Sequence, residues 1–118
     1  MDPDTVLAAV LSALAGVRRG DRVAMVGAGP VVARALLAAS GTHELVDSGA
    51  AVVVAGAAYE VPTALTLLAP GGRLVAVAAD AAAAQRVATG AGLLLGHVQK
   101  VGARVAWSAR SAEAATPT

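Results

Sequence analysis

Hydrophobic residues along this chain switch repeatedly between helical spacing and short unbroken runs. Val6, Leu7, Val10, Leu11 and Leu14 recur at the spacing of one helix face and predict an N-terminal helix. Runs without polar alternation are typical of strands that are covered on both faces. The remaining pattern predicts strands at Arg22–Val26, His43–Val46, Ala51–Ala55 and Arg73–Ala78, with helices at Val31–Ala39, Glu60–Leu68 and from the Asp80 cap to Ala88.

The last part of the chain has a different pattern. Two apolar segments, Leu93–Val98 and Arg104–Ala109, are joined by a short connection and are therefore predicted to pair antiparallel. Because parallel strands need helical crossovers, the earlier segments predict a parallel βαβ array. We therefore predict an α/β fold with a Rossmann-like sheet, mostly parallel, ending in an antiparallel hairpin. Residues 1–110 form one domain in this prediction, and residues 111–118 form a flexible tail.

Composition narrows the class of protein. The chain has 118 residues, 57% of them hydrophobic, with no Phe and one Trp, so its core must be built from Ala, Val and Leu. A net charge of +1 without clustered Lys and Arg argues against a nucleic-acid partner. Cysteine is absent and only two His occur, so no metal site is predicted. Without a leader or a membrane-length apolar run, we expect a soluble, cytoplasmic protein, and the Ala- and Gly-rich composition suggests a bacterial source.

A glycine-rich loop carries the main chemical indication. Gly27-Ala28-Gly29-Pro30 follows a predicted strand and precedes a predicted helix. Glycines at such a junction let the backbone approach a ligand, and the following helix offers free N–H groups. The same glycines could instead serve only to turn the chain tightly between strand and helix.

The motifs along the chain resemble those of class I S-adenosylmethionine-dependent methyltransferases. The glycine loop is similar to that family's motif I, and Ala57–Pro62 resembles the segment after its fourth strand. Leu67–Leu74, with its Pro-Gly-Gly turn, and the closing hairpin match the family in order and spacing. The resemblance covers nearly the whole chain. It implies S-adenosylmethionine as cofactor, held by Gly27, Ala28 and Gly29.

Three departures from the family pattern bear on function. Met25 stands where motif I has an acid that helps to organise the cofactor, and a thioether accepts hydrogen bonds poorly. Val31 replaces the last glycine of the motif. Only Ser40–Ala50 lies between the motif I helix and the fourth-strand equivalent, so the usual strand-three region is predicted to be missing.

Several side chains are open to more than one interpretation. Asp47 could bind ribose hydroxyls, as the family acid after strand two does, or simply form a turn with Ser48-Gly49. Tyr59 and Glu60 lie where such enzymes place substrate-facing groups, and Glu60 could equally cap the next helix. His97 is expected to face solvent, and Arg73 to be structural.

The resemblance and its departures together predict a reduced methyltransferase-like domain with impaired catalysis, a pseudoenzyme that acts as a binding, scaffolding or regulatory module. The alternatives are a minimal working methyltransferase on a small molecule and an NAD(P)-binding Rossmann domain, since Gly-Ala-Gly-Pro also occurs in alcohol dehydrogenases. Against the NAD(P) alternative, Val32 occupies the position of the third glycine in the Gly-x-Gly-x-x-Gly motif. A lost sheet edge leaves unpaired backbone groups, so we also expect a homodimer or another protein partner that covers it.

Overall fold

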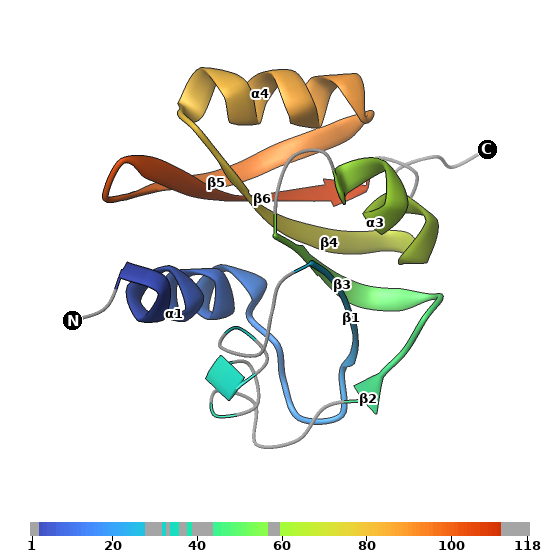
Figure 1. Ribbon diagram of the computed structural model, residues 1–118. Coiled ribbons are helices and arrows are strands. Elements are labelled where there is room, and N and C mark those ends of the chain that lie inside the picture. The colour runs from blue at the N-terminus through green and yellow to red at the C-terminus, as the bar shows by residue number, and fades with distance from the viewer. Residues whose placement is uncertain are drawn as a thin grey trace.

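The chain folds into a six-stranded sheet with helices on both faces, as a computed structural model shows (Figure 1). The structure describes residues 3–27, 32, 34–35, 38, 44–56 and 60–111. The elements in chain order are α1 (Pro3–Ala15), β1 (Arg22–Val26), β2 (Glu44–Leu45), β3 (Ala50–Ala55), α3 (Val61–Leu67), β4 (Leu68–Ala78), α4 (Ala81–Gly90), β5 (Leu93–Val101) and β6 (Arg104–Ser111). Of the helix predicted over Val31–Ala39, only residues 32, 34–35 and 38 are described, and they are helical.

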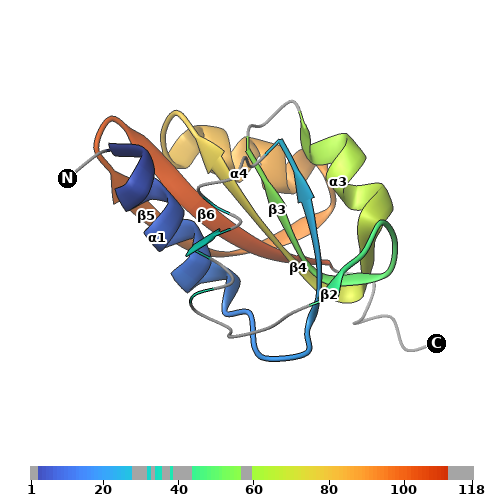
Figure 2. The same cartoon turned by 60° about the horizontal axis from the view of Figure 1, so that its bottom comes forward.

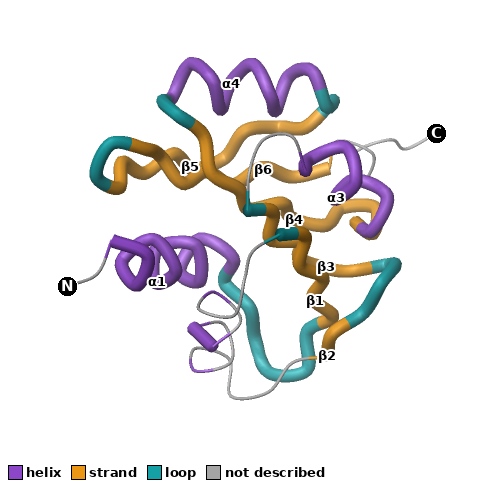
Figure 3. The backbone as a smooth tube through the Cα atoms, viewed as in Figure 1, coloured by secondary structure: helices purple, strands orange, loops and turns teal. Residues whose placement is uncertain are grey.

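The strand order is β2-β1-β3-β4-β6-β5. The strands β1 to β4 are parallel, whereas β6 inserts between β4 and β5 and pairs antiparallel with both. The backbone trace in Figure 3 shows this β5–β6 hairpin following α4. The predicted mixed sheet and its terminal hairpin are therefore confirmed. The predicted tail boundary at residue 110 precedes the last residue of β6, and residues 112–118 lie outside the described part.

Two apolar clusters occupy the two faces of the sheet. On one face, α1 packs through Ala8 and Leu11 onto Val52 and Val54. On the other, α3 and α4 pack around the fully buried Trp107. Figure 2 shows α1 on the side of the sheet opposite to α3 and α4. Since both faces of β3 are covered, its valines need no polar alternation, as the sequence predicts.

The predicted Pro-Gly-Gly turn lies within the bounds of β4. Leu68 pairs with Ala50, but the next residue of β4 to pair with β3 is Arg73, opposite Val52. The intervening segment, 69–72, therefore bulges out of the ladder. A β-carbon added to Gly72 would lie 2.8 Å from the Ala69 carbonyl oxygen, which is too close for any other residue. Because Leu68 still pairs with β3, β4 begins at Leu68 and not at the predicted Arg73.

The strand β2 is short and lies at the edge of the sheet. Its two residues pair with Arg22 and Val23, at the beginning of β1, and the Val46 N–H donates to the Val23 carbonyl at 2.9 Å. The chain then reaches β3 through only Asp47–Gly49. In the described residues no further strand lies beyond β2, which agrees with the predicted loss of the strand-three region.

The ends of β1 and β3 approach each other very closely. The Gly56 N–H donates to the Val26 carbonyl at 2.9 Å. A β-carbon built on Gly56 would overlap the Gly27 carbonyl group. Because the obstacle is backbone, it cannot rotate away as a flexible side chain could, so position 56 requires glycine.

We predict that Gly56→Ala lowers the free energy of unfolding by about 1–3 kcal/mol, the usual range for forcing extra atoms into a packed region. Urea unfolding followed by circular dichroism measures this change. Gly90→Ala is the matched control, because position 90 is helical and has nothing within 4 Å of an added β-carbon. It should leave stability unchanged or raise it by about 0.5 kcal/mol. Equal stability of the two variants would contradict the close approach.

Candidate functional site

The chain reverses its winding direction at β1. From β1 it crosses to β2 on one side, and the next strand, β3, lies on the other side. In open α/β sheets, ligands bind at the carboxyl ends of the strands beside such a reversal. Here Gly27 follows β1 and Gly56 follows β3, so these glycines mark the expected ligand position.

Glu60 brings a carboxylate to this position. It is the N-cap residue of α3, but its side chain makes no capping hydrogen bond. Instead, the carboxyl group lies over Gly27, where a β-carbon would overlap it. A β-carbon on Gly56 would also lie 3.2 Å from Glu60 Oε1. Glu60 is therefore a half-buried acid at the carboxyl edge of the sheet and does not cap its own helix.

Gly27 makes room for that carboxylate. Its φ of 65° lies in the left-handed region, which side chains rarely tolerate. The backbone conformation therefore favours glycine here, and glycine also leaves room for the Glu60 carboxyl group, which is the flexible end of a side chain. Gly27 therefore does more than turn the chain, because it leaves space for the Glu60 carboxyl group.

Met25 supplies no carboxylate beside Gly27. It lies two residues before Gly27, is only partly buried, and packs against the apolar cluster on the α1 face. The acid that the family carries at this point is absent from β1. The only carboxylate that the described residues place against Gly27 comes from a different element, the start of α3.

Asp47 does not join this site. It follows β2, whose residues pair with the start of β1, and it leads directly into β3. Arg22, which pairs with β2, and Gly27 are five residues apart along extended chain, a distance of about 17 Å. Asp47 therefore lies toward the opposite end of β1, because β2 is too short to carry it to the carboxyl edge. Its exposed position in the Asp47–Gly49 connection fits the turn interpretation.

Of the predicted site residues, the structure brings Gly27 and Glu60 together. Ala28, Gly29 and Tyr59, and also Val31, lie outside the described residues. Gly56 belongs to none of the motifs described above, although a glycine directly after a buried strand is a signal that could have found it. The contact of Glu60 with Gly27 joins residues 33 positions apart and leaves no pattern in the sequence.

Two further observations concern the described residues alone. Within the described ranges, no group of three or more His, Asp or Glu side chains is arranged to hold a metal ion. None of the described helices is long and apolar enough to cross a membrane.

Comparison with solved structures identifies the fold. A predicted O-methyltransferase from Agrobacterium tumefaciens superimposes with a TM-score of 0.64 at 13% identity, over 87% of this chain and 79% of that one. The 1,6-didemethyltoxoflavin-N1-methyltransferase of Burkholderia thailandensis, solved with its substrate and S-adenosylhomocysteine, gives 0.62 at 15% identity over 92% and 78%. A precorrin-6y C5,15-methyltransferase from Geobacter metallireducens gives 0.65 at 11% identity over 89% and 87%.

Sequence comparison adds no closer assignment, since no protein-family model and no curated protein matches the chain. One solved structure with a similar fold is a [4+2]-cyclase, with a TM-score of 0.66 at 12% identity. The fold therefore does not by itself fix the reaction. The antiparallel β6 between β4 and β5 separates this sheet from an all-parallel dinucleotide-binding sheet. The chain has the class I methyltransferase fold, without a strand beyond β2 in its described part.

Proposed function

We propose that this chain is a reduced methyltransferase-like domain that binds S-adenosyl compounds weakly at the carboxyl ends of β1 and β3. In this proposal methyl transfer is impaired, and the domain acts as a binding, scaffolding or regulatory module. The observation that carries the proposal is the Glu60 carboxylate lying against Gly27 at the winding reversal.

The residues at this edge fit the charge of the cofactor. S-adenosylmethionine carries an ammonium and a sulfonium cation, and S-adenosylhomocysteine keeps the ammonium. A carboxylate beside an open backbone turn favours such cations, because charge-assisted hydrogen bonds are about twice as strong as neutral ones. Glu60 thus supplies from α3 the negative charge that Met25 does not supply from β1. When bound, the cofactor provides an electrophilic methyl group, and Glu60 would orient its amino-acid portion.

We infer impaired catalysis because the described residues bring few anchors for a cofactor to Gly27. Methyl transfer depends mainly on alignment of the methyl group with its acceptor, which several contacts along the cofactor must hold together. Met25 offers no carboxylate, and Asp47 lies toward the far end of β1. A cofactor fixed mainly at one end would bind weakly and align poorly.

A minimal working methyltransferase is the second candidate, favoured by the fold that the chain shares with the methyltransferase neighbours. The strength of cofactor binding separates the two. A working enzyme holds its cofactor at low micromolar concentration or tighter, whereas one anchored mainly through Glu60 does not.

We predict that calorimetry gives a dissociation constant for S-adenosylhomocysteine on the order of 100 μM, equivalent to about −5.5 kcal/mol. Glu60→Gln should weaken binding about tenfold or more, because it removes the charge from a hydrogen bond worth about 1.5–3 kcal/mol. NAD and NADP should not bind.

Asp47→Asn is the matched control, since it neutralises a carboxylate that the fold keeps away from Gly27. It should leave binding unchanged. If Asp47→Asn weakened S-adenosylhomocysteine binding and Glu60→Gln did not, the result would contradict the Glu60 site and favour ribose binding by Asp47. Low-micromolar binding to the unaltered chain would instead favour the working enzyme, and no binding at millimolar ligand would refute the cofactor site.

We further propose that a second copy of the chain covers the edge strand β2. In the described residues β2 pairs only with β1, so its other side offers backbone groups to a partner. Leu45 on this strand is 63% exposed, the highest value among the large hydrophobic residues of the described part.

Light scattering after size exclusion should therefore give about twice the chain mass of 11.4 kDa. Leu45→Lys should shift the protein to monomer, because a lysine on an edge strand opposes pairing. Leu94→Lys is the matched control, since Leu94 is 60% exposed on the opposite edge strand, β5. A monodisperse monomer of the unaltered chain at high concentration would rule out the dimer.

A further inference from the structure

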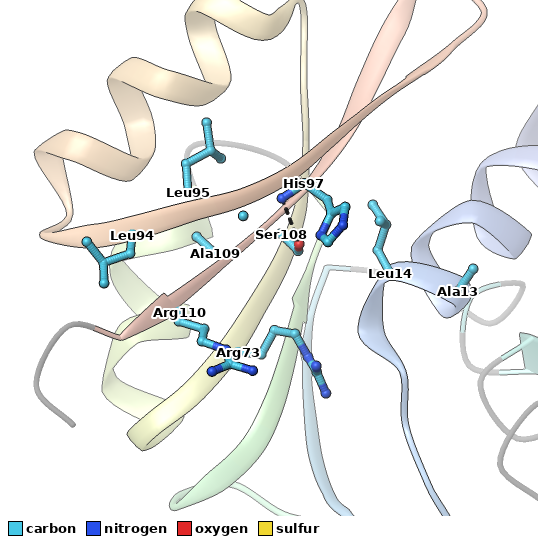
Figure 4. A pocket seen from close by; sticks show the side chains of 10 residues that line it. Ala13, Leu14, Arg73, Leu94, Leu95, His97, Ser108, Ala109 and Arg110 are labelled. Atoms are coloured by element: carbon cyan, nitrogen blue, oxygen red, sulfur yellow. Dashed lines mark hydrogen bonds between the residues drawn. The ribbon is translucent and has the colours of Figure 1, made fainter. Parts of the chain in front are cut away.

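We propose that the sheet carries a second ligand site, at its other end, for a small organic anion with an apolar body. The site is a pocket of about 470 Å³ formed by α1, β4, β5 and β6 (Figure 4). Its chemistry comes from Arg73, Arg110, His97 and Ser108, and its apolar walls include Leu14 and Leu94. The proposal does not depend on cofactor binding near Gly27.

The two arginines form an unusual pair. Arg73 of β4 and Arg110 of β6 are directly opposite each other in the antiparallel ladder, and both side chains line the pocket. Figure 4 shows them side by side. Like charges in directly opposite positions destabilise a sheet. None of the residues that line this pocket is acidic, so the lining does not offset the repulsion. A bound anion between the two guanidinium groups would offset it.

Arg73 has a hydrogen-bond donor that the described residues leave unused. Its Nε is buried and has no hydrogen-bond partner in the part of the chain that the structure describes. Another part of the same guanidinium group lies beside Gly16, since a β-carbon there would be 3.6 Å from Nη2. This places the cation at the C-terminal end of α1, where the helix dipole favours positive charge. Arg73 is thereby held in place while one of its donors stays unpaired.

A β-bulge aims His97 at the same pocket. Leu94 pairs with Arg110, and after a register shift around Gly96, His97 pairs with Ser108. In a regular ladder without this shift, His97 would lie opposite Trp107 and point to the α4 face. The backbone N–H of His97 donates a hydrogen bond to the Ser108 hydroxyl at 3.3 Å, so the buried Ser108 side chain pairs with a backbone amide of the bulge. The imidazole adds a third nitrogen-bearing group to the pocket, facing Leu14 in Figure 4.

The walls determine what kind of anion fits. Leu94 is 60% exposed beside Arg110, and Leu14 of α1 is half-buried across from it. Burying such apolar surface favours a ligand with a hydrocarbon or ring portion. The guanidinium pair favours a planar carboxylate or a phosphate, which arginine binds through two parallel hydrogen bonds. The ligand class is therefore a carboxylate or phosphate monoester on an apolar body.

This pocket is distinct from the site at Gly27. Arg73 pairs with Val52, which in turn pairs with Val23 near the start of β1. The four residues from Val23 to Gly27 correspond to about 13 Å of extended strand. Ligands at the two sites would therefore not share contacts with Arg73 or Glu60.

Titration of the full chain with hexanoate, phenyl phosphate and neutral hexanamide, followed by ¹H–¹⁵N correlation spectra, tests the proposal. We expect at least one anion to shift the His97 and Arg110 amides in a saturable way, and hexanamide to bind at least about tenfold more weakly than hexanoate if hexanoate binds. The anion that binds identifies the head group. Arg110→Gln and Arg73→Gln should each weaken that binding about tenfold. Arg86→Gln, an exposed change on α4, should not.

Thermal unfolding without ligand gives a second readout and covers the case in which Arg73→Gln fails to fold. Arg110 is exposed, and its replacement relieves the like-charge pair, so Arg110→Gln should raise the melting temperature by about 1–4 °C. A lower melting temperature would show that Arg110 is structural. Equal binding of hexanamide and hexanoate, equal loss with Arg86→Gln, or no shift with either anion at millimolar concentration would overturn the proposal.

Discussion

The close approach of three backbone and side-chain groups at the ends of β1 and β3 governs the functional edge of this protein. The Gly27 carbonyl occupies the space that a side chain on Gly56 would need, and the Glu60 carboxyl group occupies the space that a side chain on Gly27 would need. At position 56 the obstacle is backbone, and at position 27 the positive φ favours glycine. The two glycines therefore do more than turn the chain, because they let an acid from α3 reach the end of β1.

That contact changes how the methyltransferase fold can be used. The chain shares its fold with the methyltransferase neighbours, but β1 ends in Met25-Val26 with no acid. In the proposed function, Glu60 supplies this charge from the start of α3. Shortening of the chain between β1 and β3 also moves Asp47 away from the edge, since β2 ends level with Val23. The proposed weak cofactor site rests on the charge beside Gly27, and the proposed loss of catalysis rests on the position of Asp47 and the absence of an acid in β1.

Much of the fold could be predicted from the sequence because the determining features are local. Buried runs, the Asp80 cap and the short hairpin connection fixed the order and type of the elements, and Asp80 does accept a hydrogen bond from the Ala83 N–H at 2.8 Å. The candidate site was less predictable. Gly27 and Glu60 could each be named, but their contact and the displacement of Asp47 depend on strand register. The Arg73–Arg110 pair is likewise invisible until β6 is placed beside β4.

A crystal structure of the chain with S-adenosylhomocysteine would test the central proposal most directly. The ligand should lie at the carboxyl ends of β1 and β3, with its amino-acid portion within hydrogen-bond distance of the Glu60 carboxylate and its chain passing over Gly27. Asp47 should make no contact with it. A ligand bound elsewhere on the sheet, or one at this edge with Glu60 turned away from it, would contradict the proposed role of Glu60.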